Sequence, residues 1–320
     1  MTGIILLIII GIFLAMNMGA SGFSISFTPS CGSNLLKRNQ AVVLYTVFLL
    51  VGAMLIGPRV VETLTRKISQ QQISGSSGLI ILISAVITMF TANLLKIPQS
   101  TSFITVSAFV GVGLFYHQLN WFTILKIFYI ALIFSFLAYL SAYLIGSVFY
   151  PPRNNNLRFY EKVFIHRNKL RRFIIWTDCY SAFAVGTNNV ANVVAPLLAV
   201  LSVDPLILLA TTAPFFGLGG YTFGKGVLHT ISKEIVSLGE ISAGIISLVV
   251  SSFVVIASLL GLPTPYVQFT TFSVLAISSL KDSFNVTFKK TIVKRIFVVW
   301  VIMPLLTATI SFLLHQLFLK

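Results

Sequence analysis

Four short polar stretches interrupt an otherwise apolar sequence, and they hold the residues best suited to bind a ligand. Each combines Gly or Pro with hydroxyl or amide side chains, and they cover residues 17–30, 98–102, 186–192 and 263–268. We expect Gly and Pro to unwind the helices at these four places. Hydroxyl and amide groups donate hydrogen bonds, and exposed helix N-termini add backbone N–H groups and a positive dipole end. Such donors are suited to holding an anion.

We predict that the ligand is bound by side chains from all four stretches. Lys96 precedes the second stretch, where it could neutralise an anion or stand in for a cation, or could extend to the membrane surface. Small residues also allow close contact between membrane helices, which is the structural alternative for each stretch. The predicted binding residues are Ser21, Gly22, Lys96, Ser100, Thr101, Ser102, Asn188, Asn189, Asn192, Tyr266 and Gln268.

The elements that position these residues must be membrane helices. Hydrophobic residues make up 57% of the 320-residue chain and charged residues only 9%, against about 25% charged in an ordinary globular domain. Long uncharged runs separate the charges, and a membrane crossing needs about 20 mostly apolar residues. Because helices satisfy their own backbone hydrogen bonds in lipid, we predict an all-α polytopic membrane protein. Length arithmetic gives roughly ten to twelve membrane segments, including broken or re-entrant helices.

The charges predict how the chain is oriented. There are 22 Lys and Arg residues against 7 Asp and Glu, and cations are densest within residues 151–172. The positive-inside rule places this basic loop in the cytoplasm and explains the excess without a nucleic acid partner. We expect the N-terminus outside and the protein in the cytoplasmic membrane. Cys31 and Cys179 are too few for a disulfide framework or a Cys-based metal site, and we expect no cofactor. A homo-oligomer and contact of the loop with anionic lipid remain open.

The chain also contains an internal repeat. Adding 167 to a residue number places Gly19 on Gly186, and Gly57 on Gly224. Equivalent loops carry opposite charge bias, because Lys37-Arg38 corresponds to Asp204-Pro205. Such loops lie on opposite sides of the membrane. An inverted repeat of this kind is typical of secondary transporters that bind substrate near the middle of the membrane.

We therefore divide the chain into three parts. Residues 1–150 form the first transmembrane repeat, 151–175 the basic cytoplasmic loop, and 176–320 the second, inverted repeat. An anion channel is a less favoured alternative to a carrier. Motifs of intramembrane enzymes, such as H-E-x-x-H or G-x-S-x-G, are missing from the sequence, so we predict no enzyme activity.

Two of the polar stretches resemble a known family. Residues 186–192, Gly-Thr-Asn-Asn-Val-Ala-Asn, are similar to the G-A-N-D-V-A-N signature of the inorganic phosphate transporter (PiT) family. Residues 98–103, Pro-Gln-Ser-Thr-Ser-Phe, resemble that family's P-V-S-T-T-H element. The resemblance runs nearly end to end. It implies an inverted-repeat carrier of phosphate coupled to sodium or protons, or a member of the bacterial branch that carries sulfate.

Departures from the family pattern favour sulfate. The signature Asp is Asn189 here, the first-half Asn-Asp pair is Ser21-Gly22, and the His of the Ser-Thr element is Phe103. Without these carboxylates a site for a hard cation loses its charge, which argues against sodium coupling. Sulfate only accepts hydrogen bonds and is repelled by a carboxylate, whereas hydrogenphosphate can donate a proton to one. We therefore predict a sulfate permease, with a phosphate transporter as the alternative.

Coupling to protons then needs a titratable group. The three residues that we single out are Asp178, Glu62 and His229, of which the last two occupy equivalent positions in the repeats. The alternative for Glu62 and His229, which we favour, is that they are ordinary interfacial residues paired with nearby Arg59, Arg66 or Lys225.

Overall fold

The computed structural model describes residues 2–69, 74–95, 99–149, 156–201, 203–224 and 239–319. Apart from one isolated β-bridge between Ser69 and Leu119, the regular structure of these residues is helical. The first half contains α1 (Thr2–Gly32), α2 (Arg38–Leu55), α3 (Gly57–Glu62), the π-helical turn η1 (Thr63–Lys67), α4 (Gly75–Leu94), α5 (Thr101–Phe115) and α6 (Trp121–Phe149). After α7 (Leu157–Ile165) in the basic loop, the second half contains α8 (Arg167–Leu198), α9 (Pro205–Phe223), α11 (Glu240–Leu259), α12 (Tyr266–Asp282), α13 (Phe284–Lys289) and α14 (Thr291–Phe318).

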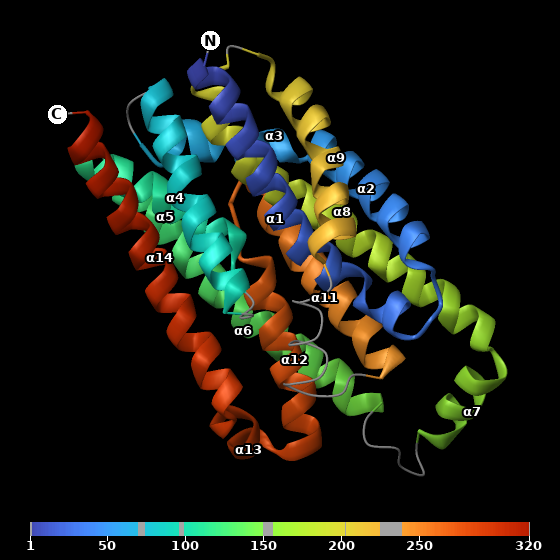
Figure 1. Ribbon diagram of the computed structural model, residues 1–320. Helices are drawn as coiled ribbons and strands as arrows, with labels where there is room; N and C mark the ends of the chain where they lie inside the picture. Colours follow the sequence, from blue (N-terminus) through green and yellow to red (C-terminus); the bar gives the residue numbers. More distant parts are fainter. Residues whose placement is uncertain are drawn as a thin grey trace.

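The helices form one bundle (Figure 1), and its outer surface is rich in exposed apolar side chains. Within the described residues, seven helices are long and apolar enough to cross a membrane: α1, α2, α4, α6, α9, α11 and α14. Many of their large apolar side chains face outward, such as Phe122 on α6 and Leu305 on α14. Helices α5, α8 and α12 pack among these seven. The predicted all-α polytopic fold is confirmed, and seven of the ten to twelve predicted membrane segments are found as full-length spans among the described residues.

The two halves pack on each other with twofold pseudo-symmetry. Helix α1 packs against α9, and its repeat counterpart α8 packs against α2, which is the counterpart of α9. The contacts match residue by residue, because the Cα of a Gly meets the backbone of the neighbouring helix at equivalent positions. The equivalent pairs are Gly19 with Phe216 and Gly186 with Leu49, and Gly52 with Phe183 and Gly219 with Met16.

Equivalent helices run in opposite directions. Helix α1 begins at the end of the bundle that holds both chain termini, whereas α8 begins beside α7 at the other end (Figure 1). Helix α6 ends near α7, whereas its counterpart α14 ends at the C-terminus (Figure 1). A repeat whose copies run oppositely across the bundle is an inverted repeat, the arrangement that the loop charges predict.

Two of the four predicted interruptions are helix breaks. Helix α4 ends at Leu94 before α5 begins at Thr101, and α11 ends at Leu259 before α12 begins at Tyr266. Both α5 and α12 begin inside the bundle, since their first residues are buried. The helix interruptions predicted at the second and fourth polar stretches are therefore present, between α4 and α5 and between α11 and α12.

The predicted unwinding at residues 17–30 and 186–192 is wrong. Helices α1 and α8 run through these stretches without a break. The glycines allow helix backbones to approach closely, which is the structural alternative noted above. Hydroxyls in α1 bond back to its own carbonyl groups, as in the 2.7 Å bond from Ser24 Oγ to Ala20 O, so the helix tolerates its serines.

Candidate functional site

Asn188, on α8, joins the two broken helices. Its Oδ1 accepts hydrogen bonds from Ser102 Oγ (2.9 Å) at the start of α5 and from Thr264 N (3.4 Å) ahead of α12. Its Nδ2 donates to Thr264 Oγ1 at 2.7 Å. We call Asn188, Ser102 and Thr264 the central junction. All three residues are fully buried. The junction brings one helix start from each half of the molecule to the same point on α8.

Helix N-termini therefore converge on the middle of the bundle. Helix α5 is capped by Ser100, whose Oγ accepts from Phe103 N at 3.2 Å. Helix α12 starts after Pro265 and has no side-chain cap. The first N–H groups of a helix have no partner within it, and the helix dipole adds about half a positive charge at that end. Two such ends create a positive potential without a charged side chain.

Unpartnered amides lie beside the junction. Gln99 is 2% exposed, and neither of its side-chain amide atoms has a hydrogen-bond partner. Asn189 and Asn192 on α8 are buried, and the Oδ1 atom of each has no partner. Buried polar groups in proteins nearly always have partners. Three amides with free hydrogen-bonding capacity beside two helix ends therefore identify a place where a polar ligand fits.

The structure brings most of the predicted binding residues to this region. Ser102 connects two of them, since it donates to Asn188 and accepts from Asn192 Nδ2 at 3.0 Å. Thr101 and Gln268 are buried in the first turns of α5 and α12. The prediction missed Gln99 and Thr264, although both lie inside the polar stretches that it identified.

The first-half residues are arranged differently. Ser21 Oγ bonds back to Met18 O at 3.0 Å within α1. A side chain at Gly22 would meet the hydroxyl of Tyr45, which is buried and has no hydrogen-bond partner. Gly22 is the repeat counterpart of Asn189. In the first half, the Tyr45 hydroxyl from α2 therefore lies where the second half has the Asn189 amide. Aromatic rings of Phe23 and Phe27 pack edge-on against Tyr45 and hold it there.

Tyr266 belongs to a separate row of buried hydrogen-bonded side chains, which extends from the first turn of α12 toward the basic loop. Its hydroxyl forms a hydrogen bond with Ser181 Oγ on α8, and Ser181 bonds Ser26 Oγ on α1 at 3.1 Å. One turn further along, Asp178 Oδ2 accepts from the backbone N–H of Ser30 at 3.0 Å and from the Ser30 hydroxyl. Asp178 Oδ1 has no partner, although the carboxyl group is fully buried. This row joins α1, α8 and α12 between the central junction and the basic loop.

Glu62, a second predicted proton-coupling residue, differs from Asp178 in its setting. Glu62 is exposed at the end of the bundle away from the basic loop. It forms an ion pair with Lys67, with 3.1 Å between Oε1 and Nζ. His229 lies outside the described residues, as does Lys96.

The described residues of the site carry no charged side chain, so its positive potential comes from the helix dipoles. Among the described residues, Asp178 is the acidic group of α8, and it lies ten residues from Asn188, about 15 Å along the helix. The described residues contain no cluster of His, Cys, Asp or Glu able to hold a metal ion. The arrangement is equipped to bind an anion through hydrogen bonds.

The sequence and fold of this chain are similar to those of known anion transporters. A family model described as "Phosphate transporter family" matches twice, at residues 18–164 and 155–311, and the two matches overlap within the basic loop. The sulfate permease CysP of Bacillus subtilis is 34% identical over 321 residues, which cover 98% of this chain and 87% of that protein. A putative phosphate permease of Pyrococcus horikoshii is 24% identical over 379 residues, covering 93% of each chain. The solved structure of a sodium-dependent phosphate transporter matches with a TM-score of 0.84 and 20% identity, covering 99% of both chains.

Proposed function

This chain is a multi-pass anion permease that belongs to the phosphate transporter family, and we propose that it carries sulfate across the cytoplasmic membrane together with protons. The observation that carries this proposal is the chemistry of the central junction. Helix N-termini, amides and hydroxyls meet there, and among the described residues no carboxylate faces them. Sulfate accepts hydrogen bonds at every oxygen and donates none, so a site made of donors and dipole ends suits it.

The free amides support binding of an oxyanion in particular. The NH2 group of Gln99 can donate to a sulfate oxygen, and rotation of the Asn189 amide by 180° presents its own NH2 group. Ser102 and Asn188 saturate each other, so we propose that they hold the helix starts in place and that Gln99, Asn189 and the first N–H groups of α5 and α12 contact the anion. Ser100, Thr101 and Gln268 complete the proposed shell.

The inverted repeat supports alternating access as the transport mechanism. Helix α5 belongs to the first half and α12 to the second, and each starts at the central junction and runs toward a different end of the bundle (Figure 1). In inverted-repeat carriers, one half rocks against the other around a fixed site. We propose that α8, which carries Asn188, stays at the centre while the two broken helices expose the anion first to one side and then to the other.

Inorganic phosphate is the second candidate substrate. The Oδ1 atoms of Asn189 and Asn192 have no donor, and the protonated oxygen of hydrogenphosphate could supply one. Relatives named as phosphate permeases cover nearly the whole chain. Sulfate remains the preferred proposal because the relative named as a sulfate permease is 34% identical and because the family carboxylates at positions 22 and 189 are replaced by Gly and Asn.

Uptake of radiolabelled sulfate into proteoliposomes tests the proposal. We expect sulfate to accumulate when a proton gradient directed inward is imposed, with no dependence on sodium and little competition from phosphate. Vesicles without protein are the control. Uptake of phosphate that sulfate does not compete with would contradict the substrate assignment, and uptake that requires sodium would contradict the coupling ion.

We propose Asp178 as the residue that carries the coupling proton. It is buried, and among the described residues no cation pairs with it. Its electrostatic neighbours are Cys31 on α1, Cys179 on α8 and Tyr266 on α12, all of which are neutral near pH 7. An unpaired charge in such a place is costly, so a carboxyl group there exchanges its proton when its surroundings change. Movement of α1 against α8 would separate Ser30 from Asp178 and open the group to water.

Asp178→Asn is expected to separate exchange from accumulation. The amide resembles the protonated acid, so we expect sulfate–sulfate exchange to persist, whereas accumulation driven by a proton gradient falls at least tenfold. The matched control is Asp282→Asn, which removes an exposed carboxylate paired with Lys290 at 2.8 Å. Asp178→Asn protein that retains the full pH dependence of accumulation would exclude Asp178 as the proton carrier.

A further inference from the structure

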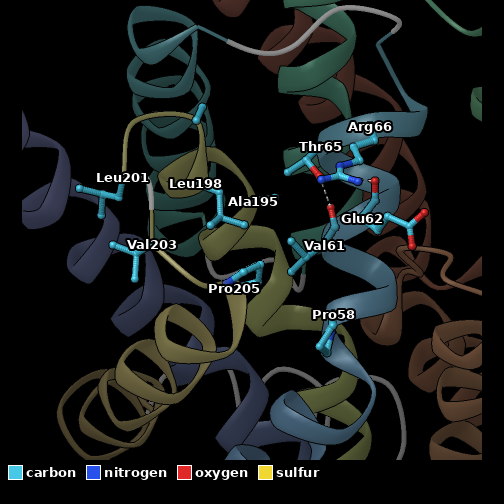
Figure 2. Close-up of a pocket in the computed structure, with 11 residues that line it drawn as sticks. Pro58, Val61, Glu62, Thr65, Arg66, Ala195, Leu198, Leu201, Val203 and Pro205 are labelled. Atoms are coloured by element: carbon cyan, nitrogen blue, oxygen red, sulfur yellow. Dashed lines mark hydrogen bonds between the residues drawn. The ribbon is translucent and has the colours of Figure 1, made fainter.

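A pocket opens at the end of the bundle opposite the basic loop. It has a volume of about 620 Å³ and lies between α3–η1 on one side and the end of α8 with the α8–α9 turn on the other. Figure 2 shows Val61, Glu62, Thr65 and Arg66 on one wall and Leu198, Val203 and Pro205 on the other. The central junction does not use this pocket, since none of its three residues lines it.

The charged wall of the pocket has an excess of positive charge. Glu62 is neutralised by its ion pair with Lys67. Arg66 is exposed, lines the pocket and takes part in no ion pair among the described residues. Its guanidinium group therefore remains available to a solute anion, next to the hydroxyl-bearing Thr65. A planar guanidinium binds the oxygens of sulfate or phosphate in pairs, and it stays charged at any working pH.

The pocket also leads toward the proposed transport site. Its lining includes Ala195, which is fully buried on α8. Ala195 is three residues beyond Asn192, which is about 4.5 Å along the helix axis. Asn192 bonds Ser102 of the central junction and has an unpartnered Oδ1. The pocket thus reaches from an exposed cation to within one helical turn of the polar centre.

We propose that this pocket is an outer vestibule in which Arg66 binds the oxyanion before it reaches the central junction. This inference rests on the proposed anion transport and adds a second binding step to it. The orientation predicted from the basic loop places the vestibule on the outer face, where the positive-inside rule leaves few cations. An unpaired arginine there has a functional explanation, because a positive pocket raises the local concentration of anions and speeds their association.

The proposal is tested by labelling a cysteine in the pocket. Cys31 and Cys179 are first replaced by alanine, and Thr65→Cys then introduces one thiol into the wall beside Arg66. We compare a thiosulfonate reagent that carries a sulfonate anion with one that carries a trimethylammonium cation, both added from the outside. For each thiol we take the ratio of the labelling rate of the anionic reagent to that of the cationic reagent. This ratio is expected to be about ten times higher at the introduced cysteine than at a free thiol in solution. External sulfate is expected to slow the labelling.

Arg66→Ala in the same background is expected to abolish the preference for the anionic reagent, and Arg66→Glu to reverse it. Arg158→Ala, which removes an exposed cation on α7 at the other end of the bundle, is the matched control. In uptake assays, Arg66→Ala is expected to raise the half-saturation concentration for the anion several-fold at low ionic strength and to leave the maximal rate unchanged. The difference is expected to shrink in salt, because mobile ions screen exposed charges.

Three outcomes separate the alternatives. Equal labelling by both reagents that Arg66→Ala does not change would overturn the vestibule. A preference that persists and is protected by phosphate but not by sulfate would keep the vestibule and contradict the proposed substrate. A lipid phosphate is the other source of an oxyanion at this surface. The lipid alternative predicts that the thiol is protected in vesicles of phosphatidylglycerol and that added sulfate gives no protection in vesicles of phosphatidylcholine. That result would assign Arg66 to lipid and overturn the proposal.

Discussion

Asn188→Ala is expected to abolish anion uptake, with a loss of at least a hundredfold. The side chain connects α8 to the start of α5 through Ser102 and to the start of α12 through Thr264. Its removal leaves buried donors and acceptors on both helix starts without partners. Each unsatisfied buried group costs about 1–3 kcal/mol, which is enough to let either helix start move. A displacement of about 1 Å at a binding site already costs a large part of its activity.

The measurement is initial uptake in proteoliposomes that contain equal amounts of protein, checked by size-exclusion chromatography. Asn120→Ala is the matched control, because Asn120 is a partly exposed asparagine that accepts from Thr123 N at 3.1 Å at the start of α6. Ser258→Ala removes a long contact of 3.4 Å to Asn188 Nδ2 and the acceptor of the 3.0 Å bond from Thr187 Oγ1, but leaves the bonds of Asn188 to Ser102 and Thr264, so we expect a partial effect. Full uptake by a folded Asn188→Ala protein would show that the central junction does not position the site.

Gly186→Ala is expected to cause one of the largest losses of stability among single methyl additions at the described glycines. The added Cβ would overlap the backbone carbonyl of Leu49 on α2, which cannot rotate away as a side chain can. Overpacking of a core typically costs about 1–3 kcal/mol. Because a backbone is displaced here, we expect about 3 kcal/mol or more, and a fall of roughly 10 °C in the Tm of the purified protein.

The pseudo-symmetry supplies an internal comparison. Gly19→Ala would place its Cβ against the backbone of Phe216, the position equivalent to Leu49, and we expect a similar fall. Gly239→Ala is the control, since no atom of the described residues lies within 4 Å of a Cβ at that position. A Tm for Gly186→Ala within about 1 °C of the Gly239→Ala value would contradict the close packing of α2 on α8.

Sequence reasoning predicted the fold class because composition and charge act over the whole chain. The apolar content requires membrane helices, and the internal repeat with its opposite loop charges indicates two inverted halves. Proline is the reason that the breaks ahead of α5 and α12 were also predictable. It removes a backbone donor and disfavours helix for the preceding residue, so Pro98 and Pro263 mark interruptions without any knowledge of the neighbours.

Glycine gave no such information. The same residue type unwinds a helix or allows a neighbour to approach, and only the position of the neighbouring helix decides between the two. Gly19 and Gly186 lie against backbones from the other half of the chain, a contact that no local pattern encodes. The importance of Thr264 and Gln99 was missed for a related reason. Which amide is saturated and which is left free depends on how three helices meet at Asn188.

Placement of the titratable residues likewise depended on tertiary structure. Asp178 and Glu62 are both acidic residues near helix ends in the sequence, yet one is fully buried and the other is 3.1 Å from a lysine at the surface. The burial of Asp178 follows from the end of α1, where Ser30 provides its backbone N–H and hydroxyl. That partner is 148 residues away in the chain.

The pseudo-symmetry has a consequence for the energies of the two end states of transport. A carrier made of two equivalent halves would populate its outward-facing and inward-facing forms about equally, because each contact broken on one side is remade on the other. The pair Asp178–Ser30 breaks this equality, since its equivalent positions are occupied by Gly11 and Leu197, which meet through apolar contact alone. Every 1.4 kcal/mol of difference between these two contacts changes the resting ratio of the forms tenfold. Under the proposed proton coupling, the protonation state of Asp178 would then set which side of the membrane the empty carrier faces.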